Sequence, residues 1–263
     1  MPVRRALWEE PVTESDVPAW HCPSCDGGYL KAAPNSLHFN QTAESKAGQA
    51  EEFSEPDWIR YVFVAILVCN NERCRESVAV SGVGTVTEVQ YGWERMEYLK
   101  RFYPKHVTPS PPIIHIPQKC PVSVRSELEQ SFVGSWGDFS SAGNHIRAAA
   151  ERLLDALKEP KTRFKRNGVD KERVPLHNRI ESLAKRDAVL GEALLAVKWL
   201  GNEASHTNKL SRKDIFDALD IFESVLIDLY DQSNERLKRL VKEINLAKGP
   251  IKIPAKKLRI RKS

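Results

Sequence analysis

The sequence predicts an α+β fold in which a small β domain is followed by an all-α helical bundle. Three observations support this prediction. Val, Ile, Tyr and Phe are concentrated in two runs of the N-terminal third, as they are in strands. Prolines then gather in one connector, where they disfavour helices and central strands. From about residue 123 onward, apolar residues recur at steps of three and four, as on the buried face of a helix.

The composition suits a soluble protein of two domains. Its 263 residues include 41% hydrophobic and 29% charged residues, which is ordinary for globular chains. The longest apolar run is "YVFVAILVC", residues 61–69, far shorter than the ~20 residues that span a bilayer. No apolar run follows the basic residues near the N-terminus, so no signal peptide is expected. We therefore expect a cytoplasmic protein with no membrane partner and with reduced cysteines.

The β domain is expected over residues 15–93. Its two strand-like runs are "WIRYVFVAILVC", residues 58–69, and "ESVAVSGVGTVTEVQYGW", residues 76–93, which should pair as a hairpin. A linker is expected over 94–122, since "YPKHVTPSPPIIHIPQKCP" carries six prolines. Such a segment should be extended and semi-rigid, and neither helix nor central strand.

The helical domain is expected over residues 123–246. The first apolar stripe runs from Phe139 to Leu157, a polar loop with Pro160 and Gly168 follows, and two shorter stripes run from Leu176 to Leu183 and from Leu190 to Leu200. "SRKD", residues 211–214, has the form of a capping box and should start one long last helix that reaches Leu240. Four to five helices with short connections predict an antiparallel bundle.

Four cysteines form two close pairs in the β domain. "CPSC" contains Cys22 and Cys25, and "CNNERC" contains Cys69 and Cys74 at the turn between the two predicted strands. Two such pairs at chain reversals resemble a zinc ribbon, so we expect them to bind one Zn²⁺. Four thiolates would fill the coordination shell, which makes the zinc structural. The alternative is four buried free thiols; Cys120 has no partner in the sequence.

The positive charge is unevenly placed. The net charge is +5, and the tail "KGPIKIPAKKLRIRKS", residues 248–263, holds seven Lys or Arg and no acid. The basic tail, assigned to residues 247–263, and the basic loop "KTRFKRNGVDKER", residues 161–173, could contact nucleic-acid phosphates. The residues expected to make these contacts are Lys165, Arg166, Lys256, Lys257, Arg259 and Arg261. The alternative for the tail is a solubilising terminus without a specific partner.

The stretch "KWLGNEASH", residues 198–206, interrupts a good helix pattern with Gly201. A glycine there costs roughly 1 kcal/mol relative to alanine, so a close helix contact is its expected reason. Asn202 and His206 are four apart and share a helix face. They could bond to each other or to the backbone, or they could face a groove in which His206 acts as a general acid or base beside Lys198.

These helical segments together resemble a known family. "AGNHIRAAAERLLDALK", "LHNRIESL", "VKWLGNEASH" and "SRKDIFDALDIFESVLIDLYD" are similar to the domain of unknown function 4145 (DUF4145), within the HEPN superfamily. The resemblance covers roughly residues 120–232, and the paired cysteines with the connector look like the same family's usual N-terminal part. It implies a HEPN-like helical bundle, often dimeric, in restriction, toxin or antiphage systems.

The resemblance also implies a possible ribonuclease, but one residue departs from it. HEPN ribonucleases use an Arg shortly before a His. His206 matches the His, whereas Trp199, Leu200 and Gly201 stand where the Arg would fall. Lys198 lies too far back, and an ammonium does not reproduce the bidentate grip of a guanidinium.

We therefore expect a zinc-containing HEPN-like protein that binds nucleic acid or a partner protein, as a homodimer and in a prokaryotic defence setting. One alternative is a metal-independent ribonuclease that uses His206 with Asn202 and with Lys198 or Arg147. The other is a structural dimerisation module.

Overall fold

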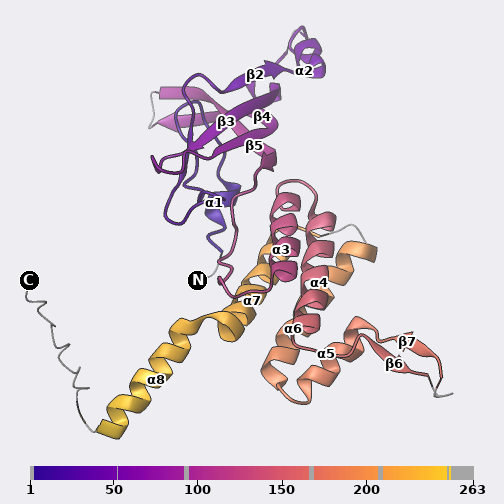
Figure 1. The fold of residues 1–263 in the computed structure, drawn as a ribbon. Coiled ribbons are helices and arrows are strands. Elements are labelled where there is room, and N and C mark those ends of the chain that lie inside the picture. Colours follow the sequence, from indigo (N-terminus) through magenta and orange to yellow (C-terminus); the bar gives the residue numbers. More distant parts are fainter. Residues whose placement is uncertain are drawn as a thin grey trace, which may run out of the picture.

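The computed structural model describes residues 3–51, 53–91, 95–165, 169–206, 210–247 and 249, with the side chains of 91, 95, 202–206, 232–238 and 247 outside the description. The α+β prediction is confirmed: an antiparallel sheet is followed by helices (Figure 1). None of the helices in the described ranges is long and apolar enough to cross a membrane.

The N-terminal sheet curves into a half-barrel in the order β1-β3-β4-β5, with β2 also paired to β3 (Figure 1). Its strands are β1 (Leu30–Ala32), β2 (His38–Gln41), β3 (Arg60–Cys69), β4 (Ser77–Tyr91) and β5 (Arg95–Thr108). The predicted hairpin is confirmed, since β3 and β4 pair from Arg60 with Thr85 to Val68 with Ser77. Alternate residues of β3 are buried from Phe63 to Cys69, which places one face of the hairpin on the core. Short helical turns interrupt this part: α1 (Ala6–Glu9), α2 (Ala43–Gly48) and η1 (Pro56–Trp58).

The expectation that residues 94–122 form a linker apart from the sheet was wrong for the first half of that range. Arg95–Thr108 forms β5 and pairs with β4 along its length. Pro104 fits because β5 is the last strand in the order and because the register shifts beside its partner Gly82. Only residues 109–121 run without helix or strand between the sheet and the helices.

The helices follow the predicted stripes, with two differences. They are α3 (Val122–Gly134), α4 (Phe139–Ala156), α5 (Leu176–Ala184), α6 (Ala188–His206), α7 (Arg212–Tyr230) and α8 (Gln232–Ala247). The capping box of Ser211 and Asp214 is confirmed at the start of α7. The expected single last helix breaks at Asp231, in the run "DQSN", where Asp, Ser and Asn favour caps over helix interiors. The expected polar loop before α5 is a hairpin of β6 (Thr162–Phe164) and β7 (Lys171–Arg173).

A cluster of aromatic side chains joins the sheet to the helices in one continuous core. The centroid of the Trp8 ring lies 6.4 Å from that of Trp20, 5.1 Å from that of Trp136 in the turn after α3 and 6.3 Å from that of Phe216 on α7. Arg212 donates to the carbonyl of Trp8 at 2.6 Å. The segment before the sheet therefore lies between the two parts of the fold (Figure 1).

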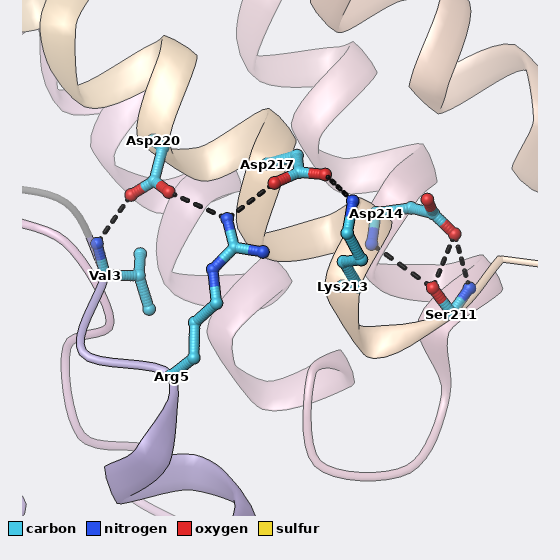
Figure 2. A network of polar contacts seen from close by, with 7 residues as sticks. All are labelled: Val3, Arg5, Ser211, Lys213, Asp214, Asp217 and Asp220. Atoms are coloured by element: carbon cyan, nitrogen blue, oxygen red, sulfur yellow. Dashed lines mark hydrogen bonds and ion pairs between the residues drawn. The ribbon is translucent and has the colours of Figure 1, made fainter.

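Ion pairs hold this N-terminal segment on α7 (Figure 2). The amide of Val3 donates to Asp220 at 2.6 Å, and Arg5 donates to Asp217 at 2.5 Å and to Asp220 at 3.1 Å. Lys213 also pairs with Asp217, at 2.8 Å. Hydrogen bonds from Lys213 and Arg5 hold the pKa of the Asp217 carboxyl below its usual range. The contribution of this carboxylate to stability is therefore present above the usual carboxyl pKa and is lost as the pH falls below it.

Candidate metal centre

Cys22, Cys25, Cys69 and Cys74 converge at one end of the sheet. Their four sulfur atoms all lie within 4.8 Å of one another, and the Cys22–Cys74 and Cys25–Cys69 sulfurs are each 3.7 Å apart. A tetrahedral ion with Zn–S bonds of ~2.3 Å separates its sulfur ligands by about 3.8 Å. The four predicted ligands therefore lie close enough to hold a metal ion.

Both cysteine pairs sit in turns whose backbone supports thiolate charge. The amide of Ser24 points to the Cys22 sulfur at 3.4 Å, and the amide of Asn71 points to the Cys69 sulfur at 3.4 Å. The side-chain amide of Asn71 adds a contact to the Cys25 sulfur at 3.6 Å. N–H groups aimed at sulfur stabilise a thiolate, which is the form that binds a metal.

Gly28 leaves room for the sulfurs. A Cβ at this position would lie 2.5 Å from the Cys69 sulfur and 2.8 Å from the Cys25 sulfur, closer than any side chain can pack. Its neighbour Gly27 has φ +82°, a left-handed conformation that glycine adopts without strain. The two glycines of "DGG" thus fit the turn that holds the first cysteine pair.

Two polar contacts tie the cysteine turns to each other. The Ser24 hydroxyl donates to Glu76 at 2.5 Å, and the amide of Tyr29 donates to the Asn70 side chain at 2.9 Å. Glu76 and Asn70 flank the turn between β3 and β4, whereas Ser24 and Tyr29 belong to the loop before β1. The two turns are therefore held in register by more than the sulfurs.

His21 and Cys120 lie outside the sulfur group. The His21 ring packs against Tyr29, with centroids 4.7 Å apart. Cys120 is buried in the connector, where burial raises the pKa of its thiol. Among the described residues, the possible ligands at this cluster are the two cysteine pairs.

The pKa values of Cys22, Cys25 and Cys74 depart from the usual value of a thiol. Burial raises the pKa of Cys22 to about 12. Burial also acts to raise the pKa of Cys25, but hydrogen bonds, first from Cys74 and then from the other thiols, bring it below its usual value. A divalent ion bound here would replace the protons of the thiols, so the affinity of the site for the ion would decrease as the pH is lowered.

The helical half carries the second predicted site, of which the structure describes a part. A Cβ on Gly201 would lie 3.1 Å from the Cβ of Arg147 and 3.2 Å from the carbonyl oxygen of Gly143. The expected close contact of α6 with α4 is therefore confirmed. The side chains of Asn202 and His206 lie outside the described residues.

The basic residues that sequence reasoning singled out are only partly described. Lys198 is buried, and its ammonium lies 3.6 Å from the ring centroid of Trp199. Lys165 is exposed just after β6. The other five predicted contacts lie outside the described residues: Arg166, between β6 and β7 in the sequence, and Lys256, Lys257, Arg259 and Arg261 in the tail.

A polar pocket beside α4 was not predicted as a site. It has a volume of about 440 Å³, within the usual range for ligand sites, and Asn144, Arg147, Glu151 and Arg173 line it. The buried Nε of Arg147 has no hydrogen-bond partner in the part of the chain that the structure describes. Arg173, the last residue of β7, pairs with Glu151 at 2.8 Å. Only the helical spacing of residues 144, 147, 148 and 151 could have indicated this surface.

Two family models match the chain. Residues 10–110 match a domain of unknown function (DUF8608), and residues 130–257 match a domain of unknown function (DUF4145). The searches of curated proteins and of solved structures each found no match. The resemblance of the helical half to DUF4145 is confirmed, whereas the N-terminal part, expected to belong with that family, matches a separate one. The chain therefore joins a sheet region similar to DUF8608, which holds the cysteine cluster, to a helical region similar to DUF4145.

Proposed function

We propose that this chain is a zinc-containing protein that binds nucleic acid through its helical half. The zinc is structural and is held by Cys22, Cys25, Cys69 and Cys74. The nucleic acid is bound by its phosphates at the pocket beside α4. The observation that carries the binding proposal is the pair of guanidinium groups, from Arg147 and Arg173, that line this pocket.

Ligand chemistry supports a structural zinc. Four sulfurs at tetrahedral spacing suit Zn²⁺ and leave no position for a substrate or an activated water. The ion would bridge the loop before β1 and the turn between β3 and β4, which are distant in sequence. It would therefore stabilise the sheet rather than take part in a reaction.

Charge and unsatisfied donors support phosphate binding at the pocket. An unpaired buried donor such as the Nε of Arg147 costs about 1–3 kcal/mol, which an anionic oxygen would recover. Arg173 has donors beyond those that face Glu151, and its side chain is 78% exposed. Glu151 opposes an anion, but the two guanidinium groups outweigh its single charge. The basic tail adds seven positive charges to the same chain.

Arg173→Gln should weaken binding of a labelled oligonucleotide about tenfold at low salt, because it removes a charged hydrogen-bond donor. The slope of log affinity against log salt should fall by about one, since one phosphate contact is lost. Fluorescence anisotropy over a salt series measures both. Arg163→Gln is the matched control, as Arg163 pairs with Glu172 on the opposite face of the hairpin. Equal losses in the two variants, or no binding by the wild type, would refute the proposal.

The ribonuclease remains the second candidate, and the contact of Gly201 with Gly143 and Arg147 favours it. That contact is made five residues before α6 ends at His206, and it brings α6 to the helix that carries the pocket. If Arg147 substitutes for the missing Arg, the protein should cleave RNA in the presence of EDTA, and His206→Ala should abolish this cleavage. A wild type that binds RNA and leaves it intact would identify the site as a binding site.

The homodimer, the cytoplasmic location, the HEPN-like ancestry and the role in antiphage defence stay predictions from the sequence. The structural dimerisation module also stays an alternative. Sedimentation of the purified chain would test the dimer.

A further inference from the structure

We propose that the hairpin of β6 and β7 selects single-stranded nucleic acid by stacking a base on Phe164. This inference rests on the proposed function, because the phosphate of the stacked nucleotide would lie at the pocket beside α4. It adds an aromatic contact that phosphate binding alone does not require.

The strand register places the relevant side chains on one face of the hairpin. Phe164 pairs with Lys171, and Thr162 pairs with Arg173. Since side chains alternate between the faces of a strand, these four residues point to the same side. The intervening pair, Arg163 and Glu172, points to the other side and forms an ion pair at 2.7 Å.

Phe164 is presented to solvent in a cationic setting. Phe164 is 62% exposed, and the ammonium of Lys171 lies 5.1 Å from the centroid of its ring. A lone exposed aromatic is ordinary on protein surfaces. Here, however, the ring shares its face with Arg173, which lines the pocket. An aromatic platform beside cations is the usual means of binding single strands.

The hairpin is attached firmly enough to hold this geometry. Lys161, just before β6, pairs with Asp155 at 2.7 Å, and the Val174 amide donates to the Lys161 carbonyl at 2.8 Å. Arg179 pairs with the same Asp155 at 2.8 Å. Two residues along the strand separate Phe164 from the position opposite Arg173, a distance of ~7 Å. One nucleotide can therefore place its base on the ring and its phosphate beside the pocket.

A duplex does not offer the same contact. Its bases are stacked on both faces inside the helix, so Phe164 could reach one only after the base is unstacked. Duplex phosphates could still bind Arg173. Single strands should therefore bind more tightly than duplexes, and the difference should depend on Phe164.

The test measures anisotropy of fluorescein-labelled oligo-U, oligo-dT and a duplex of the same length with the full chain. Phe164→Ala should weaken single-strand binding about tenfold, given about 1–3 kcal/mol for each stacked base, and should leave duplex binding unchanged. Phe164→Tyr should bind as the wild type does. Phe53→Ala is the control, since Phe53 is 81% exposed and lies outside the hairpin. Comparison of the affinities for oligo-U and oligo-dT shows whether the chain prefers RNA or DNA.

A second variant reports stacking directly. Phe164→Trp should show fluorescence quenching on addition of the single strands and none on addition of the duplex. Single-strand binding unchanged in Phe164→Ala, or a wild type that prefers the duplex, would overturn the inference and leave phosphate binding standing. No binding of any oligonucleotide would overturn the proposed function as well.

Discussion

Cys69→Ser is expected to abolish zinc binding and to unfold the N-terminal sheet. Cys69 is fully buried at the end of β3, and its sulfur lies 3.7 Å from that of Cys25. Structural zinc contributes roughly 10–16 kcal/mol in small zinc-binding peptides, as much as the whole stability of an ordinary domain. Elemental analysis should find one zinc per wild-type chain and none in the variant. Circular dichroism should show a loss of strand signal.

Three further variants test whether loss of zinc is specific to the four-cysteine cluster. Cys120→Ser should keep its zinc, because Cys120 lies outside the sulfur cluster. Gly28→Ala should lower zinc content, since its Cβ would lie 2.5 Å from the Cys69 sulfur. Gly48→Ala is its control, as a Cβ there meets nothing within 4 Å. Acidification should release the zinc as protons compete for the thiolates. Wild-type protein that contains no zinc, or Cys69→Ser protein that contains as much zinc as the wild type, would disprove the zinc site.

The cysteine cluster could be predicted from the sequence because its information is local. Each pair is close in the chain, "DGG" marks the first turn, and the second pair lies between two clear strands. Only the approach of the two pairs to each other is a long-range property. Two close pairs of reduced cysteines are nevertheless expected to converge on a shared metal ion. The capping box at Ser211 was found for the same reason.

The parts that sequence reasoning missed depend on long-range contacts. β5 contains Pro104 and lies in a proline-rich segment, so its pairing with β4 is visible only in the assembled sheet. The pocket needs Arg173, which the hairpin brings back to α4 from 22 residues beyond Glu151. The contact of Arg5 with Asp217 spans 212 residues, and no local pattern indicates it. Local propensity thus located the β3–β4 hairpin and the apolar helix stripes, but neither β5, the β6–β7 hairpin nor the surfaces between elements.

Trp8→Ala should lower the melting temperature sharply and separate the unfolding of the sheet from that of the helices. Trp8 is 8% exposed and packs on Trp20, Trp136 and Phe216, so it contacts both parts of the fold. Truncating a buried aromatic side chain costs about 3–5 kcal/mol. At about 2–4 °C per kcal/mol for a chain near this size, the melting temperature should fall by roughly 10 °C.

Calorimetry distinguishes a general loss of stability from a loss of coupling. The aromatic cluster and the Arg5 ion pairs join the N-terminal segment to α7, so the wild type should unfold in one transition. Without the Trp8 ring, the zinc-bearing sheet should unfold in a transition of its own that moves with zinc concentration, whereas the helical transition should not. Trp58→Ala is the control, because Trp58 is 47% exposed. A Trp8→Ala protein that melts like the control would show that the two parts are joined by other contacts.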